Sequence, residues 1–287
     1  MQKIDTHQHL FYPDQFAYSW TEAYPDLQGA FPVEDYQKAA DDCEIAGTLF
    51  MEVDVDAEQH AQEAQFFSRL SEQKTNSIQG VVAKCLPEAD DFSQQLEAVR
   101  SPALTGIRRV LHTQPNALSE SSLFRRNVAV LAEEDLSFDL CVTQTQLSFA
   151  LDLVRACPSV RFILDHCGVP SIAEHDSLKS ESWQQWQAGI RALAKEPNVA
   201  CKFSGITVYA GPEQRNVDGL RPYLMEILEA FGSDRIVWGG DWPVCNLADG
   251  LRAWSVLTDA LLAELSTNEQ QAICMYNAQR IYKLSDN

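Results

Sequence analysis

Short hydrophobic segments alternate with longer amphipathic segments along the whole chain. In the longer segments apolar residues recur about every 3.6 positions, the period of an α-helix, as over residues 146–156 and 219–231. In the short segments apolar residues follow one another directly, which predicts strands. The pattern predicts eight strands, at residues 3–7, 47–53, 78–84, 104–110, 137–143, 161–166, 199–204 and 235–240.

Eight strands that are each followed by a helix predict a closed (β/α)8 barrel. Repeated strand–helix units require parallel strands whose sheet is covered by helices. An open, doubly wound sheet is the alternative, but neither a GxGxxG nor a GxxxxGK(S/T) nucleotide loop occurs. No linker, low-complexity run or internal repeat divides the chain. We therefore expect an α/β fold, a single TIM barrel domain over residues 1–287.

Polar side chains follow the predicted strands at their carboxyl ends. The first strand ends in Asp5-Thr6-His7-Gln8-His9, and the alternation of strand side chains sends His7 and His9 the same way, into the barrel mouth if Asp5 points there. His166 ends the sixth strand and Asp241 follows the eighth. Such groups are costly inside a hydrophobic barrel, and the carboxyl ends of the strands carry the active sites of barrel enzymes.

This combination of three histidines and one aspartate points to hydrolytic chemistry. Imidazoles in an HxH pair can hold a divalent cation or donate hydrogen bonds to a developing oxyanion. A carboxylate on the opposite rim can take a proton from an attacking water. An HxH pair alone often has a structural role, whereas HxH together with His166 and Asp241 indicates a catalytic site.

Two long connections follow predicted strands and would lie near this mouth. Residues 10–32 are rich in aromatic side chains, among them Trp20, and residues 207–219 are polar and contain glycine. They either shape a substrate pocket or only decorate the barrel. Trp242, next to Asp241, is a further candidate to line the pocket together with Trp20.

With these features the chain resembles the amidohydrolase superfamily, whose barrels begin with HxH after the first strand and end with Asp after the eighth. It is most similar to the lactonase-type "amidohydrolase 2" branch, which includes sugar-acid lactonases of the L-fucono- and L-rhamnono-lactone kind and a pyrone-dicarboxylate lactonase. The matching stretches span nearly the whole chain: IDTHQHLFYP, GIRRVLH, FDLCVTQTQL, FILDHCGVP, NVACKFSGI, FGSDRIVWGGDWPVC and YNAQRIYKL.

The resemblance implies a hydrolase that opens an aldono-1,4- or 1,5-lactone in carbohydrate metabolism. It makes Asp241 the base that activates water. It makes His7, His9 and His166 the groups that polarise the lactone carbonyl, directly or through a metal. The alternatives are a metal-dependent decarboxylase of the same superfamily and a non-catalytic barrel.

The resemblance also implies a cationic substrate pocket. Arg108 and Lys202 match positions near the family's pocket, and Arg108 is preferred to Arg109 because the family motif is Gly-(Ile or Val)-Arg. Lys84 and Arg108 would bind hydroxyl groups or the nascent carboxylate, and arginine is suited to bidentate contact. An ion pair of Lys84 with Glu52 at the rim is the alternative for that lysine.

One departure from the family concerns the metal. Dinuclear amidohydrolases carry a bridging lysine or glutamate after the fourth strand and a histidine after the fifth, but this chain has arginine there and the motif FDLCVTQ. Two metals would therefore lack ligands. We expect either no strict metal requirement or one divalent cation, most simply zinc, bound by His7, His9 and Asp241, with or without His166.

The composition excludes several classes of partner. With 41 acidic residues against 22 lysines and arginines, the net charge is −19, which repels nucleic acid and anionic lipid. No apolar run reaches the about 20 residues of a membrane span. The eight cysteines are scattered singly, which indicates a reducing compartment, the cytoplasm. We expect a small-molecule substrate and leave a homo-oligomer open.

Overall fold

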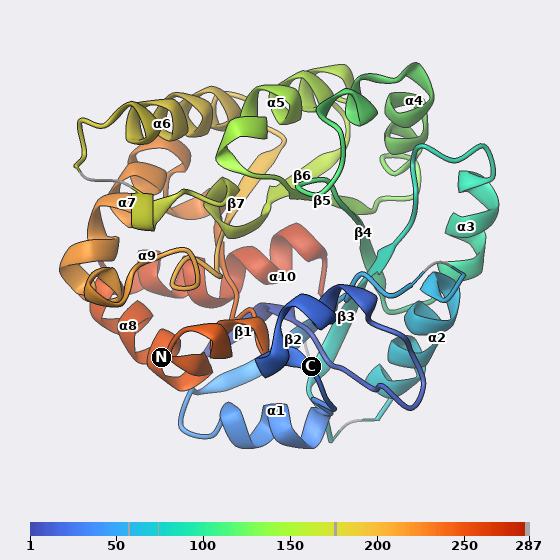
Figure 1. Ribbon diagram of the computed structural model, residues 1–287, viewed down its shortest axis with the longest axis horizontal. Helices are drawn as coiled ribbons and strands as arrows, with labels where there is room; N and C mark the ends of the chain where they lie inside the picture. The colour runs from blue at the N-terminus through green and yellow to red at the C-terminus, as the bar shows by residue number, and fades with distance from the viewer. Residues whose placement is uncertain (57, 74, 175–176, 285–287) are drawn as a thin grey trace.

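The eight predicted strands form a closed parallel barrel (Figure 1) in a computed structural model, which describes residues 1–56, 58–73, 75–174 and 177–284. The strands are β1 (Lys3–Gln8), β2 (Ile45–Met51), β3 (Ile78–Lys84), β4 (Leu104–Val110), β5 (Ser137–Cys141), β6 (Arg161–Leu164), β7 (Val199–Phe203) and β8 (Ile236–Trp238). They pair in the order β1 to β8, and a parallel bridge between Gln8 and Trp242 closes the barrel. The predicted (β/α)8 fold is confirmed.

Helices cover the outside of the barrel and its amino-terminal end. They are α1 (Val33–Ala39), α2 (His60–Ser71), α3 (Phe92–Val99), α4 (Ser122–Val130), α5 (Leu147–Ala156), α6 (Glu181–Ala194), α7 (Val217–Phe231), α8 (Gly250–Leu262), α9 (Thr267–Gln271) and α10 (Asn277–Tyr282). Each long helix buries one stripe. In α6, for example, Trp186, Ile190 and Leu193 are buried at helical spacing, and Ser180 caps the helix by accepting a hydrogen bond from the Trp183 N–H.

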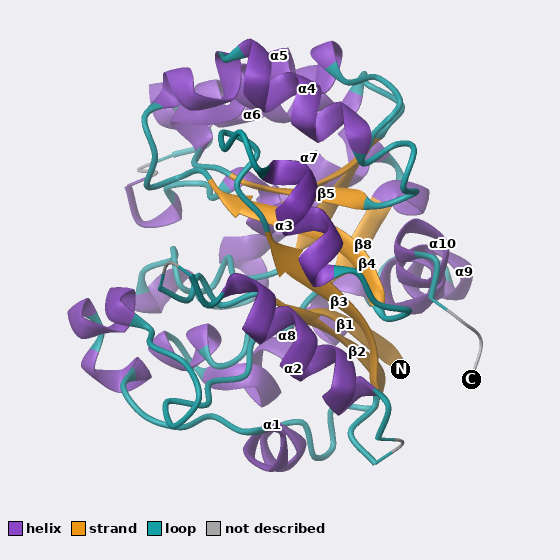
Figure 2. Cartoon of the chain, turned by 90° about the vertical axis from the view of Figure 1, so that its right-hand side faces the viewer, coloured by secondary structure: helices purple, strands orange, loops and turns teal. Residues whose placement is uncertain are grey.

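The amino-terminal end of the barrel is closed by α10. Strand residues such as Ile4, Leu49 and Val237 form a cluster inside the barrel, and Ile281 and Tyr282 of α10 pack against it. In Figure 2, α9 and α10 lie at one end of the strands, while irregular loops lie at the other end. The carboxyl end, where the loops begin, is therefore the end of the barrel that α10 does not cover.

Five strands end earlier than the pattern predicts: β2 at Met51, β5 at Cys141, β6 at Leu164, β7 at Phe203 and β8 at Trp238. The differences at β6 and β8 shape the mouth. After β6 the backbone turns into the left-handed region at His166 (φ 51°), and after β8 it does so at Asp241 (φ 58°). Non-glycine residues seldom adopt this conformation, and it is concentrated at functional sites.

Two further observations concern the cysteines and the length of the helices. All eight cysteines are free and buried. Among the described residues, no helix is both long enough and apolar enough to cross a bilayer.

Candidate active site

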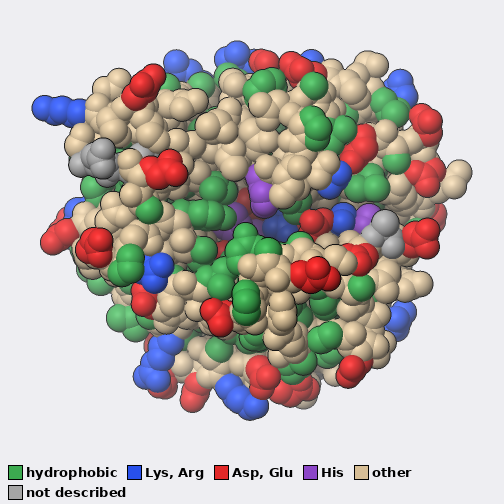
Figure 3. Space-filling model, viewed as in Figure 1, with side chains coloured by type: hydrophobic (Ala, Val, Ile, Leu, Met, Phe, Trp, Pro, Cys, Tyr) green, Lys and Arg blue, Asp and Glu red, His purple; other side chains and the backbone are tan. Residues whose placement is uncertain are grey.

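A cavity of about 260 Å³ lies at the carboxyl end of the barrel, and His9, His166 and Asp241 line it together with Arg108 and Trp20. In the space-filling view, histidine and charged side chains are visible in a hollow near the middle of this face (Figure 3). The two long connections also reach the cavity, since Tyr24 and Leu27 line it from the first and Val208 and Tyr209 from the second.

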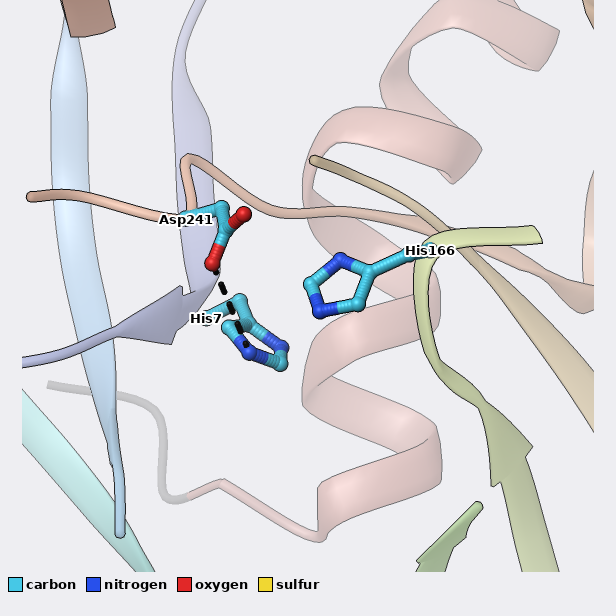
Figure 4. A group of neighbouring side chains, drawn as sticks. All are labelled: His7, His166 and Asp241. Carbon is cyan, nitrogen blue, oxygen red and sulfur yellow. Dashed lines mark ion pairs between the residues drawn. The ribbon is translucent and has the colours of Figure 1, made fainter. Parts of the chain in front are cut away.

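Three of the predicted residues converge at the bottom of this site (Figure 4). Potential ligand atoms of His7, His166 and Asp241 all lie within 4.8 Å of one another. The carboxylate Oδ1 of Asp241 is 3.8 Å from Nε2 of His7 and 3.6 Å from Nε2 of His9. The four residues that the sequence singled out as catalytic therefore form one cluster.

Backbone and side-chain hydrogen bonds fix the histidine rings. Nδ1 of His9 donates to the Met51 carbonyl at 2.9 Å, which leaves Nε2 of His9 as an unprotonated nitrogen facing Asp241. Nδ1 of His166 bonds the Ser204 hydroxyl at 2.9 Å. These partners orient the rings in the way that outer groups orient the histidine ligands of a metal.

The sequence left open whether Asp5 points into the mouth, and the structure shows that it contacts α1 instead. Its carboxylate accepts hydrogen bonds from the Tyr36 hydroxyl on α1 and from the Gly240 N–H, so it is not part of the catalytic cluster. The β1–β2 pairing shifts register between Asp5 and Gln8. His7 and His9 nevertheless lie together, with ring centroids 4.8 Å apart.

Two buried cations lie beside His7. The Arg108 guanidinium is held by Glu52, with Nε 2.5 Å from Oε1, and its Nη1 is 3.3 Å from Nε2 of His7. The Lys202 ammonium lies 2.7 Å from Asp139, 2.8 Å from Asp165 and 3.2 Å from Nδ1 of His7. Arg108 lines the cavity, whereas Lys202 lies behind the histidines within the barrel.

The remaining predicted binding residues take other positions. Arg109 points away from the site and pairs with Glu88, which settles the choice between the two arginines. Lys84 pairs with Asp54 at 2.6 Å and does not line the cavity, although Asp54 does. Trp242 is buried against the rings of Phe31 and Tyr36 and does not line the cavity either.

Burial sets the protonation of the cluster. It raises the pKa of Asp241 to about 6, against the lowering effect of His166 and Arg108. Burial and then Arg108 lower the pKa of His9 to about 4, and burial and then Lys202 hold the pKa of His7 well below its usual range. At neutral pH the cluster thus combines a carboxylate base with neutral imidazoles.

Sequence reasoning missed two residues that shape the cluster. Asp165 faces Lys202 and His7, and these two groups outweigh the effect of burial and hold its pKa well below the usual range. Gly205 has φ +65°, and a Cβ there would lie 2.5 Å from Nδ1 of His166 and 2.7 Å from Oδ2 of Asp241. The glycine of the CKFSG motif was the available signal for this close approach.

The donor set fits one divalent cation. Nitrogen and oxygen atoms from His7, His166 and Asp241 are close enough to share an ion, and His9 adds a further free nitrogen beside Asp241. Two imidazoles and one carboxylate are typical ligands of catalytic zinc, with a position left for water.

Comparison with known proteins gives a consistent picture. Residues 4–284 match the family described as Amidohydrolase. An L-fucono-1,5-lactonase from Burkholderia multivorans is 28% identical over 99% of this chain and 97% of its own. Another, from Burkholderia ambifaria, is 34% identical over 150 residues, 52% of this chain and 49% of that protein. The crystal structure of a zinc-bound amidohydrolase from Burkholderia multivorans is 26% identical, with a TM-score of 0.88 over 99% of this chain and 100% of that chain.

Proposed function

The chain belongs to the amidohydrolase family, and we propose that this enzyme hydrolyses the ring ester of a sugar-acid lactone, with L-fucono-1,5-lactone as its representative substrate. The observation that carries the proposal is the Asp241 carboxylate. Its pKa is near 6, and it stands at the bottom of the cavity within 4 Å of two imidazoles. A buried base of this pKa is suited to activating water at neutral pH.

The hydrolysis would proceed in two steps. Asp241 removes a proton from a water that attacks the lactone carbonyl, and the Arg108 guanidinium, which lines the cavity beside His7, stabilises the oxyanion. Asp241 then returns this proton to the ring oxygen as the carbon–oxygen bond breaks, which yields the hydroxy acid. Arg108 lines the cavity and is positioned to bind a hydroxyl group or the new carboxylate.

We propose one divalent cation, zinc, held by His7, His166 and Asp241 with His9 beside them. When bound, such an ion polarises the carbonyl and lowers the pKa of water. The ammonium of Lys202 and the guanidinium of Arg108 border the same histidine, and their charges oppose a second cation.

The cavity walls support a neutral, partly apolar substrate. Asp54, His112 and Thr113 line it from the loops after β2 and β4, together with the apolar Val53 and Val110, whereas Val244 and Leu247 line it from the loop after β8. L-Fuconolactone has hydroxyl groups on one side of its carbonyl and a methyl group beyond its ring oxygen. The polar side would bind the hydroxyl groups, and the apolar side would hold the methyl group.

The small number of cationic side chains in the cavity also favours a neutral lactone over a dicarboxylate. Among the described residues that line the cavity, Arg108 is the one lysine or arginine, and Glu52 pairs with it. A lactone with two carboxylates would need more positive charge than this.

A pH-indicator assay over a lactone panel tests the proposal. We expect hydrolysis of L-fucono-1,5-lactone at least tenfold faster than of its 6-hydroxy analogue, L-galactono-1,5-lactone, and a loss of rate after chelation that zinc restores. Absence of hydrolysis with every aldonolactone would contradict the function. Full activity in chelator would contradict only the metal.

The other sequence-based hypotheses have less support, because an L-fucono-1,5-lactonase matches 99% of this chain at 28% identity. Carbon dioxide release from hydroxybenzoates would favour a decarboxylase, and failure of lactone, ester and acid panels would favour a non-catalytic barrel. We retain the proposals of a cytoplasmic enzyme and a small-molecule substrate, since the acidic composition opposes binding to nucleic acid or membranes.

A further inference from the structure

A chain of buried polar contacts runs from the amino-terminal end of the barrel to the catalytic cluster. It begins on α10, where the Tyr282 hydroxyl donates to Oδ2 of Asp139 at 2.6 Å. The same carboxylate oxygen accepts from Lys202 at 2.7 Å, and Lys202 in turn lies 3.2 Å from Nδ1 of His7. Tyr282, Asp139, Lys202 and His7 are each at most 1% exposed.

The Lys202 ammonium has three close polar neighbours in this arrangement. It donates a hydrogen bond to Asp139, forms an ion pair with Asp165 at 2.8 Å and lies 3.2 Å from Nδ1 of His7. Tyr282 also contacts Lys202 through its ring, whose centroid is 5.5 Å from Nζ. The position of the ammonium beside His7 therefore depends on how the Asp139 carboxylate is held.

The Tyr282 hydroxyl is well placed to hold that carboxylate. The other oxygen of Asp139, Oδ1, has a longer contact of 3.3 Å with the Ser137 hydroxyl. Without Tyr282, only Lys202 would bond Oδ2 at short range, and the carboxylate would be free to rotate toward it. Charge-assisted hydrogen bonds inside a protein are strong and depend on geometry, so a small rotation here would move the ammonium.

We propose that Tyr282 is a positioning residue for the active site, acting through Asp139 and Lys202 on His7. The helix that closes the far end of the barrel would thus help to set the geometry at the mouth. This inference rests on the proposed lactonase function for its readout. It concerns a residue that touches neither the substrate nor the cavity.

Tyr282→Phe tests the hydroxyl alone, because phenylalanine keeps the ring and its contact with Lys202. The matched control is Thr258→Val, which removes a buried hydroxyl that accepts from Trp238 Nε1 at 3.0 Å between β8 and α8. We expect kcat of Tyr282→Phe to fall about tenfold with KM within about twofold, and kcat of Thr258→Val to stay unchanged. Equal kcat in both variants, at any loss of stability, would overturn the proposal.

A double-mutant cycle tests the route through Asp139. We expect Asp139→Asn to reduce kcat more than Tyr282→Phe does, and the double variant to equal Asp139→Asn within about twofold, because both changes break one chain. Independent, multiplicative losses would overturn the route. If Asp139→Asn fails to fold, the comparison of kcat between Tyr282→Phe and Thr258→Val decides whether Tyr282 is a positioning residue. A wild-type protein inactive on all lactones would instead refute the proposed function.

Discussion

The two ends of the barrel are built from the same strands but have opposite chemistry. β7 contributes Ala200 to the apolar cluster at the amino-terminal end and Lys202 to the charged network two residues later. β6 contributes Ile163 to the first and is followed by Asp165 in the second. Two residues along a strand thus separate a side chain that stabilises the fold from one that serves the site.

The difference shows how a barrel combines stability with reactivity. The amino-terminal end gains free energy by removing apolar surface from water, and α10 covers it. The carboxyl end buries carboxylates and cations at a desolvation cost, which pairs such as Arg108–Glu52 offset. Substitutions at the two ends should therefore change different observables.

Asp241→Asn gives the largest expected change and acts at the mouth alone. Removing the base should lower kcat at least about 1,000-fold, within the range that general base catalysis contributes, and leave the fold intact. Asp259→Asn is the control, since Asp259 pairs with Lys3 away from the cavity. A steady-state assay that finds a tenth of the wild-type rate in Asp241→Asn would exclude Asp241 as the base.

Gly205→Ala should affect both activity and stability. Its methyl group would collide with His166 and Asp241, so we expect kcat/KM to fall about 100-fold or more. Gly232→Ala is the control, because φ is +70° there and no atom lies within 4 Å of the added Cβ. Both variants should lose about 1–3 kcal/mol of unfolding free energy from the positive φ, but Gly232→Ala should keep full activity. Equal activity of the two variants would contradict the role of Gly205.

Leu49→Ala tests the amino-terminal end. Leu49 is fully buried in the apolar cluster, and truncation should cost about 2–5 kcal/mol of unfolding free energy with kcat per folded molecule unchanged. Val256→Ala, at a side chain that is 61% exposed, should change stability by about 0.5 kcal/mol or less. Denaturant unfolding measures both. If kcat of Leu49→Ala fell as much as kcat of the variants at the mouth, the amino-terminal end would not be separate from catalysis, and the comparison of the two ends would fail.

Glu63→Gln should have a smaller effect, an increase in unfolding free energy that depends on pH. Glu63 is a buried carboxyl group behind the mouth. Burial and then Glu52 raise the pKa of Glu63 well above its usual range, so the folded state keeps a proton that the unfolded chain releases. Wild-type stability therefore falls as pH rises above about 4.3, the ordinary pKa of Glu, whereas the glutamine variant escapes this loss.

Urea unfolding at pH 5 and pH 8 measures this effect. The gain of the variant relative to wild type should be larger at pH 8 than at pH 5 by at least about 1.4 kcal/mol, the free energy of one pKa unit. Glu133→Gln, on the exposed surface, should show no such change between the two pH values. A gain independent of pH would show that the buried charge is not its cause.

Much of the site could be predicted because it depends on local order along the chain. The HxH pair, His166 and Asp241 follow strands whose hydrophobic pattern is clear, and parallel strands bring their carboxyl ends together. The expectation for Trp242 failed because burial against Phe31 and Tyr36 depends on how a distant loop packs. The hydrophobic pattern extended the sixth strand to residue 166, whereas the chain leaves β6 directly after Leu164, and this turn brings Asp165 into the site.

The sequence by itself determined the barrel, its order of strands and the place of His7, His9, His166 and Asp241 at its mouth, because hydrophobic period and strand ends are local properties. Only the tertiary structure decided that Arg108 rather than Arg109 faces inward, that Gly205 makes room for His166 and Asp241, and that Lys202 is held between two aspartates. These features join segments far apart in the chain. Their geometry depends on packing and on the pairing of buried charges, which no local pattern encodes.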